Sequence, residues 1–196
     1  MVGTRRAAWR VLSSIQKKEM AKGNKENFNK VKIYKGIIED ELKQNCQEIL
    51  ELLDDHLLPN STTSEAKVFF HKMKADYHRY IAEFEKAELR DKAKQKAKQA
   101  YEDATNMARN SLSSTHPMKL GLALNHSVFC YEILGSPEQA CKMARNAFDE
   151  AIADLDNVQD SYYKDATLIM QLLRDNLLLW TVEQAEDEAI AGPGNK

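Results

Sequence analysis

The run KMKADYHRY (residues 72–80) combines helical spacing with an unusual set of charged side chains. In an α-helix, Lys72, Asp76, Arg79 and Tyr80 fall at i, i+4, i+7 and i+8, which places them on one face. A buried cation is costly unless it is paired. The stripe therefore suits either a solvated ion-pair face or a site built to receive an anion. On spacing alone, the ion-pair face is the simpler interpretation.

The composition around this run favours long helices. The chain has 196 residues, enough for one domain with a substantial core, and contains only 7 glycines and 4 prolines. We expect an all-α fold, an antiparallel array of about seven helices over residues 1–183. An acidic, disordered tail is expected over residues 184–196.

Helical spacing and turn residues set the expected boundaries. The first helix covers residues 4–20, and the second follows Gly23-Asn24 and runs to His56. The others are expected at residues 64–84, 97–110, 118–134, 137–155 and 162–183. Residues 85–98 are interpreted as a charged, solvated linker. Ser64 is predicted to cap the third helix, and Ser136 with Gln139 to form a capping box.

Charge, hydropathy and cysteine usage exclude several classes of protein. A net charge of −2 gives no overall attraction to nucleic acid. No apolar run is long enough for a membrane span, and the first residues lack the pattern of a signal peptide. The three cysteines have no metal-ligand spacing and are expected to be reduced, buried thiols in a cytoplasmic protein.

Catalytic motifs are missing from the sequence. There is no phosphate-binding glycine loop, HExxH motif or nucleophile elbow, and the five histidines are scattered. We therefore expect no enzymatic activity, no metal and no cofactor. Cys130 as a nucleophile is the enzymatic alternative, and it requires a thiol of lowered pKa.

Two later segments repeat a mixed apolar and polar pattern. One ridge is formed by Leu124, Asn125, Val128 and Glu132, and the other by Leu168, Leu172, Asn176 and Leu179. A buried amide needs hydrogen-bond partners. The two asparagines could clamp the backbone of an extended peptide, or they could form interhelical hydrogen bonds, and spacing alone does not decide between these.

Four runs resemble signatures of the 14-3-3 proteins: LGLALNHSVFCYEIL (residues 120–134), YKDATLIMQLLRDNLLLWT (163–181), VGTRRAAWR (2–10) and the opening run preceded by residues 67–69. The resemblance implies an all-helical adaptor that binds phosphoserine or phosphothreonine in client proteins such as kinases and regulatory proteins. It also implies homodimers or heterodimers with relatives.

The resemblance assigns roles to individual residues. Arg6, Arg79 and Tyr80 would hold the phosphate, Lys72 would line the groove and Asp76 would orient the arginines. Asn125 and Asn176 would bond the ligand backbone. The apolar wall of the groove would be formed by Leu124, Val128, Leu168, Ile169, Leu172 and Leu179. Glu132 and Trp180 would complete the groove. The dimer surface would include Ala8, Val11, Leu12, Ile15, Tyr34 and Glu41.

The likeness starts within what would be the third helix of a nine-helix family domain. A phosphate-contacting lysine of the family lies upstream of Met1, as does the helix that packs on the dimer surface. We therefore expect weakened phosphopeptide affinity and impaired homodimerisation. The alternative from another class is a tetratricopeptide-like scaffold for unmodified peptides, although no period of about 34 residues recurs.

Overall fold

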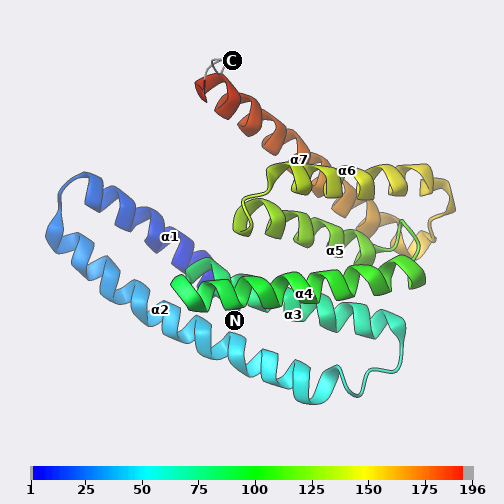
Figure 1. Cartoon of the computed structure of the whole chain (residues 1–196), viewed down its shortest axis with the longest axis horizontal. Coiled ribbons are helices and arrows are strands. Elements are labelled where there is room, and N and C mark those ends of the chain that lie inside the picture. The colour runs from blue at the N-terminus through cyan, green and yellow to red at the C-terminus, as the bar shows by residue number, and fades with distance from the viewer. Residues whose placement is uncertain (1, 192–196) are drawn as a thin grey trace.

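The computed structural model describes residues 2–191, and the side chains of residues 2–186. The described residues form seven α-helices and no strand, which confirms the all-α prediction (Figure 1). Three short helical turns, η1 to η3, extend or connect them. In chain order the elements are α1 (Val2–Ala21), α2 (Lys25–Leu52), η1 (Leu53–Leu57), α3 (Ser64–Phe84), α4 (Ala87–Ser111), α5 (Pro117–Val128), η2 (Phe129–Ile133), α6 (Pro137–Ala153), η3 (Leu155–Asn157) and α7 (Asp160–Ala191).

The helices form two parts with separate cores. Helices α1 and α2 form an antiparallel hairpin that extends away from the rest of the molecule (Figure 1). Its small core is completed by Phe84 from the end of α3. A larger core lies among α3 to α7 and includes Tyr101, Phe129 and Leu173. We refer to these two parts as the hairpin and the body.

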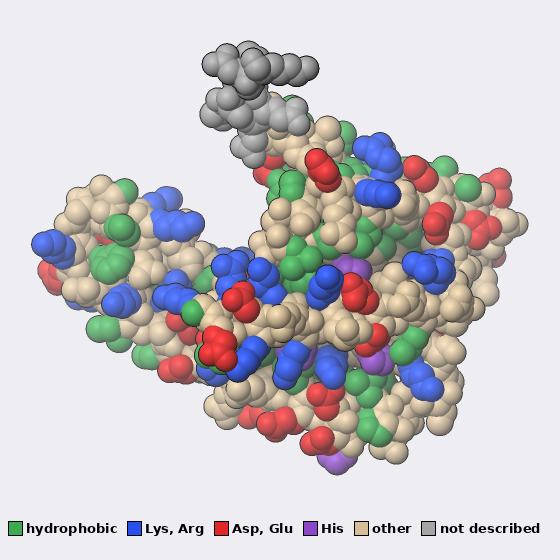
Figure 2. All heavy atoms as spheres, in the orientation of Figure 1, with side chains coloured by type: hydrophobic (Ala, Val, Ile, Leu, Met, Phe, Trp, Pro, Cys, Tyr) green, Lys and Arg blue, Asp and Glu red, His purple; other side chains and the backbone are tan. Residues whose placement is uncertain are grey.

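The predicted linker over residues 85–98 is wrong, because α4 starts at Ala87 and continues through it. A stripe of small residues explains the helix. Five alanines at helical spacing lie on the buried side of α4, and these are Ala93, Ala97, Ala100, Ala104 and Ala108. Small side chains allow close approach of the helices, and the lysines between them face outward. Figure 2 shows basic and acidic side chains interspersed on the exposed side of α4, as expected for a solvated face.

Both predicted capping residues need correction. The side chain of Thr63, not Ser64, accepts the hydrogen bond from the Ala66 backbone N–H at the start of α3. Ser136 does precede α6, but its side chain makes no capping hydrogen bond. The turn before α6 instead depends on Gly135, whose φ of +64° lies in the left-handed region where glycine is favoured, and on Pro137 at the first helical position.

The predicted single helices that ended at His56 and Leu134 each finish in a π-helical turn. At the other end of the chain, α7 continues to Ala191 rather than stopping near Glu183. Alanine and glutamate in this segment are strong helix formers, which accounts for the extension. Residues 192–196 of the predicted tail lie outside the described residues. Within residues 2–191, no helix is long and apolar enough to span a membrane.

Candidate functional site

The stripe on α3 is a buried ionic network, not a solvated face. The Arg79 side chain is 6% exposed, and its Nη2 donates to Asp76 Oδ1 at 3.1 Å. Its Nε donates to the Tyr101 hydroxyl at 2.9 Å, and that hydroxyl in turn donates to Asp76. Lys72 Nζ donates to the second Asp76 oxygen at 2.8 Å. Asp76 therefore fixes both cations on its own helix.

Burial and charge oppose each other at Asp76. Burial acts to raise the pKa of this carboxyl group. The charges of Lys72 and Arg79, with hydrogen bonds from Lys72 and Tyr101, outweigh it and hold the pKa below its usual value. At Arg79 burial acts in the other direction and lowers the pKa. The neighbouring Tyr101 and Asp76 outweigh burial, so the pKa of Arg79 is raised overall. The pair is ionised at neutral pH.

The hairpin brings a second arginine to the same place. Arg6 on α1 forms a two-pronged pair with Glu83 on α3, with Nη2–Oε1 and Nε–Oε2 distances of 2.6 and 3.2 Å. The Arg6 guanidinium lies 3.7 Å from the centre of the Tyr80 ring, and that of Arg79 lies 4.8 Å from it. The three residues expected to hold phosphate are therefore neighbours.

Sequence reasoning missed two members of this network, Glu83 and Tyr101. Glu83 also lies 3.5 Å from Arg79 Nη1 and 3.6 Å from Arg10 Nη2, so one carboxylate serves three arginines. Its spacing of four residues from Arg79 was a usable signal. Tyr101 lies in the helix predicted over residues 97–110, but spacing within that helix gives no sign that its hydroxyl meets Arg79 and Asp76 on α3.

The α5 side joins the network through Asn125. Its amide nitrogen donates to both oxygens of Asp76, each at 3.0 Å. The amide thus forms an interhelical hydrogen bond with α3, which was one of the two possibilities left open. Close by, a Cβ on Gly121 would lie 3.9 Å from both Lys72 Cε and Ile169 Cδ1. Helices α3, α5 and α7 therefore meet at this point.

The expected apolar wall is accessible on α7. Leu168, Leu172 and Leu179 are exposed. Half-buried Asn176 lies among them and has no hydrogen bond with the described residues. Leu124, Val128 and Ile169 are partly buried against the core. Figure 2 shows an open notch between the hairpin and the body.

Glu132 and Trp180, which were expected to complete the wall, make contacts with other parts of the protein. Glu132, in the π-helical turn η2, lies 3.9 Å from Arg10 Nη2 and so faces α1. Trp180 is only 4% exposed and stacks on Tyr131 at 4.7 Å between ring centres. Its role in this structure is packing beneath the surface of the site.

The hairpin carries half of the expected dimer surface on its outside. Val11 and Ile15 on α1 and Tyr34 on α2 are exposed, together with Ile33 and Ile37, which were not assigned to that surface. Ala8 is partly buried, Leu12 packs inside the hairpin core, and Glu41 is paired with Arg5.

The rival enzymatic site is not supported by geometry. Cys130 is buried, and burial raises the pKa of its thiol to about 11, which disfavours the nucleophilic thiolate. All three cysteines are free thiols. Within the described part of the chain, no group of three or more His, Cys, Asp or Glu side chains is placed to hold a metal ion.

The fold and the charged network together define an all-α protein of antiparallel helices with a two-part basic site. The family model for "14-3-3 protein" matches residues 1–181, and the chain belongs to the 14-3-3 family. This family match confirms the resemblance seen in the sequence and decides against the tetratricopeptide-like scaffold. It also supports an adaptor role, with binding to client proteins and pairing with relatives.

Several relatives align over nearly the whole chain. The tomato "14-3-3 protein 7" is 55% identical over 95% of this chain and 74% of its own length. The "14-3-3-like protein GF14 iota" of Arabidopsis thaliana is 54% identical over 95% of this chain and 70% of its own length. The "14-3-3 protein I" of Plasmodium falciparum is 55% identical, covering 95% and 71%.

Proposed function

We propose that this protein binds phosphorylated serine or threonine in client proteins, with the phosphate held by Arg6, Arg79 and Tyr80. The supporting observation is the convergence of two arginines, from α1 and α3, on the ring of one tyrosine. A phosphorylated side chain carries about −1.5 to −2 charges and three acceptor oxygens. Two guanidinium forks and a phenol hydroxyl match that set of acceptors.

The acidic partners would prepare the arginines for this ligand. Asp76 and Glu83 hold Arg79 and Arg6 in place before an anion arrives. An unphosphorylated serine would have to compete with water while offering no charge, so the site favours the phosphorylated form. The client backbone would run along α5 and α7, bonded by Asn125 and Asn176, with apolar side chains against Leu168, Leu172 and Leu179.

The direct test is fluorescence polarisation with one peptide in phosphorylated and unphosphorylated forms. We expect a preference of at least about a hundredfold for the phosphorylated peptide, since each charge-assisted bond contributes about 1.5–3 kcal/mol. Arg6→Ala should abolish most of that preference, as should Arg79→Lys, which keeps the charge but loses the fork. Equal binding of the two peptides by the wild-type protein would refute the proposal.

Arg5→Ala is the matched control for Arg6→Ala. Arg5 precedes Arg6 on the same helix but pairs with Glu41 on α2 instead of Glu83. We expect its removal to leave phosphopeptide affinity within about twofold. If Arg5→Ala and Arg6→Ala weakened binding equally, general charge attraction and not a specific phosphate site would account for the affinity.

The remaining expectations are separate parts of the proposal. Pairing with a second 14-3-3 chain would use the exposed apolar side of the hairpin, and a cytoplasmic location fits its free thiols. Weaker phosphopeptide affinity than a 14-3-3 relative is tested by titrating one peptide into both proteins. Impaired homodimerisation is tested by light scattering at micromolar concentration, where a tight homodimer would contradict it.

A further inference from the structure

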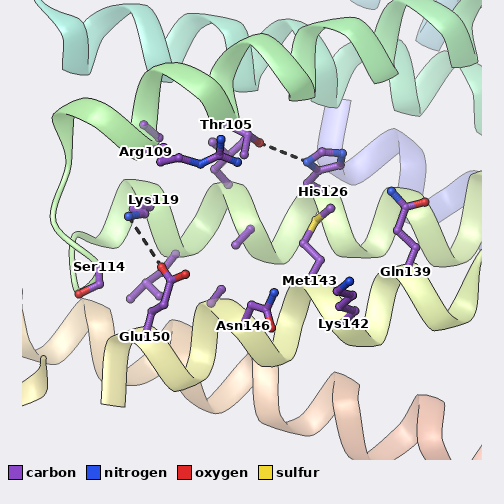
Figure 3. A pocket seen from close by; sticks show the side chains of 15 residues that line it. Thr105, Arg109, Ser114, Lys119, His126, Gln139, Lys142, Met143, Asn146 and Glu150 are labelled. Carbon is purple, nitrogen blue, oxygen red and sulfur yellow. Dashed lines mark hydrogen bonds and ion pairs between the residues drawn. The ribbon is translucent and has the colours of Figure 1, made fainter. Parts of the chain in front are cut away.

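A cavity of about 490 Å³ lies between α4, α5 and α6, away from the proposed phosphate site (Figure 3). Its inner surface is largely apolar and is formed by Ala108, Leu120, Leu122, Ala123, Met143 and Ala147. A concave apolar surface of this volume, with a few polar groups, is typical of sites for small molecules.

The charged side chains around the cavity are mostly cationic. Arg109, Lys119 and Lys142 line it with a single carboxylate, Glu150. Glu150 lies 4.0 Å from Lys119 Nζ, as the dashed line in Figure 3 marks. Arg109 and Lys142 have no hydrogen bond or ion pair with any residue whose side chain the structure describes. Both side chains are exposed, so water solvates their charges and either is available to an anion.

The polar groups at the inner end are neutral and satisfied. The Thr105 hydroxyl donates to the Tyr101 carbonyl at 2.7 Å and lies 3.3 Å from His126 Nδ1. Burial lowers the pKa of His126 to about 4, so its ring is uncharged at neutral pH. The inner end of the cavity therefore suits the apolar part of a ligand. The cationic side chains at its rim are the groups that would bind an anion.

We propose that this cavity binds a small amphipathic organic anion, with an apolar body of about ten carbons against α5 and α6 and its carboxylate on Arg109, while Lys142 on the other side of the cavity adds to the positive potential. Arginine and carboxylate form charge-assisted, two-pronged hydrogen bonds, so the arginine would fix the ligand's orientation. The apolar body would cover side chains that water now contacts.

The cavity and the phosphate site are separated by two stacked rings. The His126 ring stacks on Tyr101 at 4.9 Å between centres, and the Tyr101 hydroxyl contacts Asp76 and Arg79. A ligand in the cavity would reach the first ring but not Arg79. The two ligands should therefore bind at the same time, and the cavity can be tested whether or not the protein binds phosphopeptides.

The test is an NMR titration of the full chain with decanoate, compared with decanol, which has the same apolar body without the charge. We expect saturable shifts at the backbone amides of Ala123, His126 and Met143, and at least fivefold weaker binding of decanol. Equal binding of the two compounds would overturn the proposal. So would shifts concentrated on Ile33 and Ile37 of the hairpin, which would indicate general adhesion to an exposed apolar surface.

Two variants and a matched control locate the site. The double variant Arg109→Gln with Lys142→Gln should weaken decanoate binding at least tenfold. Lys98→Gln with Lys164→Gln removes the same charge outside the cavity and should change the affinity less than twofold. Ala147→Phe should fill the cavity and abolish binding. Unchanged affinity in the charge double variant would refute the site even if Ala147→Phe failed to fold.

Discussion

The body and the hairpin differ in the size of their buried apolar cores. In the body, α3 and α4 meet through alanines with almost no exposed surface, and Tyr101 and Phe129 fill the centre. In the hairpin, Val11, Ile33 and Ile37 point outward, and the core is a short row of residues completed by Phe84. The body thus has a large buried core and exposes apolar side chains mainly on α7, whereas the hairpin has a small core and exposes apolar side chains along its outer side.

This difference matters because the proposed phosphate site uses both parts. Arg79 and Tyr80 belong to the body, and Arg6 on α1 is held beside them by Glu83 and the Tyr80 ring. One half of the site is thus fixed by deep burial and the other by a surface-proximal contact. Substitutions in the two halves should separate folding from binding.

The largest effect is expected in the body. Arg79→Ala leaves Asp76 buried with one of its two cations removed, and breaking a buried ion pair costs about 3–5 kcal/mol. Urea unfolding followed by circular dichroism measures the loss. Arg174→Ala, an exposed arginine on α7, should change the free energy of unfolding by less than about 0.5 kcal/mol. A loss below about 1 kcal/mol for Arg79→Ala would show that the network contributes little to folding.

Acid should weaken the body through its buried histidines. Burial lowers the pKa of His126 from 6.5 to about 4, so the unfolded chain binds a proton that the folded chain excludes. The contribution of neutral His126 to the free energy of unfolding is therefore fully present above about pH 6.5. It is lost as the pH falls towards 4, by about 3 kcal/mol in all. His126→Phe keeps a ring against Tyr101 and should reduce the drop in melting temperature between pH 7 and 5.

The exposed His56 provides the control for that experiment. His56→Gln removes an exposed histidine and should leave the melting temperature at pH 7 unchanged. His78, which is also buried and whose pKa burial also lowers to about 4, keeps part of the slope in His126→Phe. A slope identical to wild type in His126→Phe would contradict the assignment.

The sequence predicted only part of the charged network around Asp76. Helical spacing placed Lys72, Asp76, Arg79 and Tyr80 on one face, and the resemblance added Arg6. Spacing within one helix cannot reveal that Tyr101 and Asn125 approach Asp76 from two other helices. Burial could not be deduced either, since a charged stripe has the same pattern whether water or another helix covers it.

The error over residues 85–98 has the same origin. Lysines at alternate positions suggested a linker, although alanines at spacings of three and four already marked a buried stripe. Alanine contributes weakly to hydropathy, so a seam made of it is easily overlooked. Where helices pack through small residues, their spacing is a better guide than their hydrophobicity.

A smaller loss of stability is expected at the other half of the site. Arg6→Ala removes the pair with Glu83, which then keeps contacts with Arg10 and Arg79. Because the Arg6 side chain is 17% exposed, water can replace part of the interaction, and we expect a cost of about 1.5 kcal/mol. The same urea experiment measures it. A cost equal to that of Arg79→Ala would remove the distinction between the two halves.

The smallest effect on folding is expected on the outer side of the hairpin. Val11→Gln with Ile33→Gln should change the free energy of unfolding of the isolated chain by less than about 0.5 kcal/mol for each substitution, because both side chains are already in contact with water. Association with a second 14-3-3 chain should nevertheless be lost, since the apolar area that would be covered is removed. Sedimentation velocity of mixtures with a relative such as the tomato protein measures this.

The exposed pair Leu178 and Val182 on α7, changed to glutamine, is the matched control and should leave association intact. If both double variants weakened association equally, the pairing surface would not be specific to the outer side of the hairpin, and exposed apolar side chains of either part would account for the association.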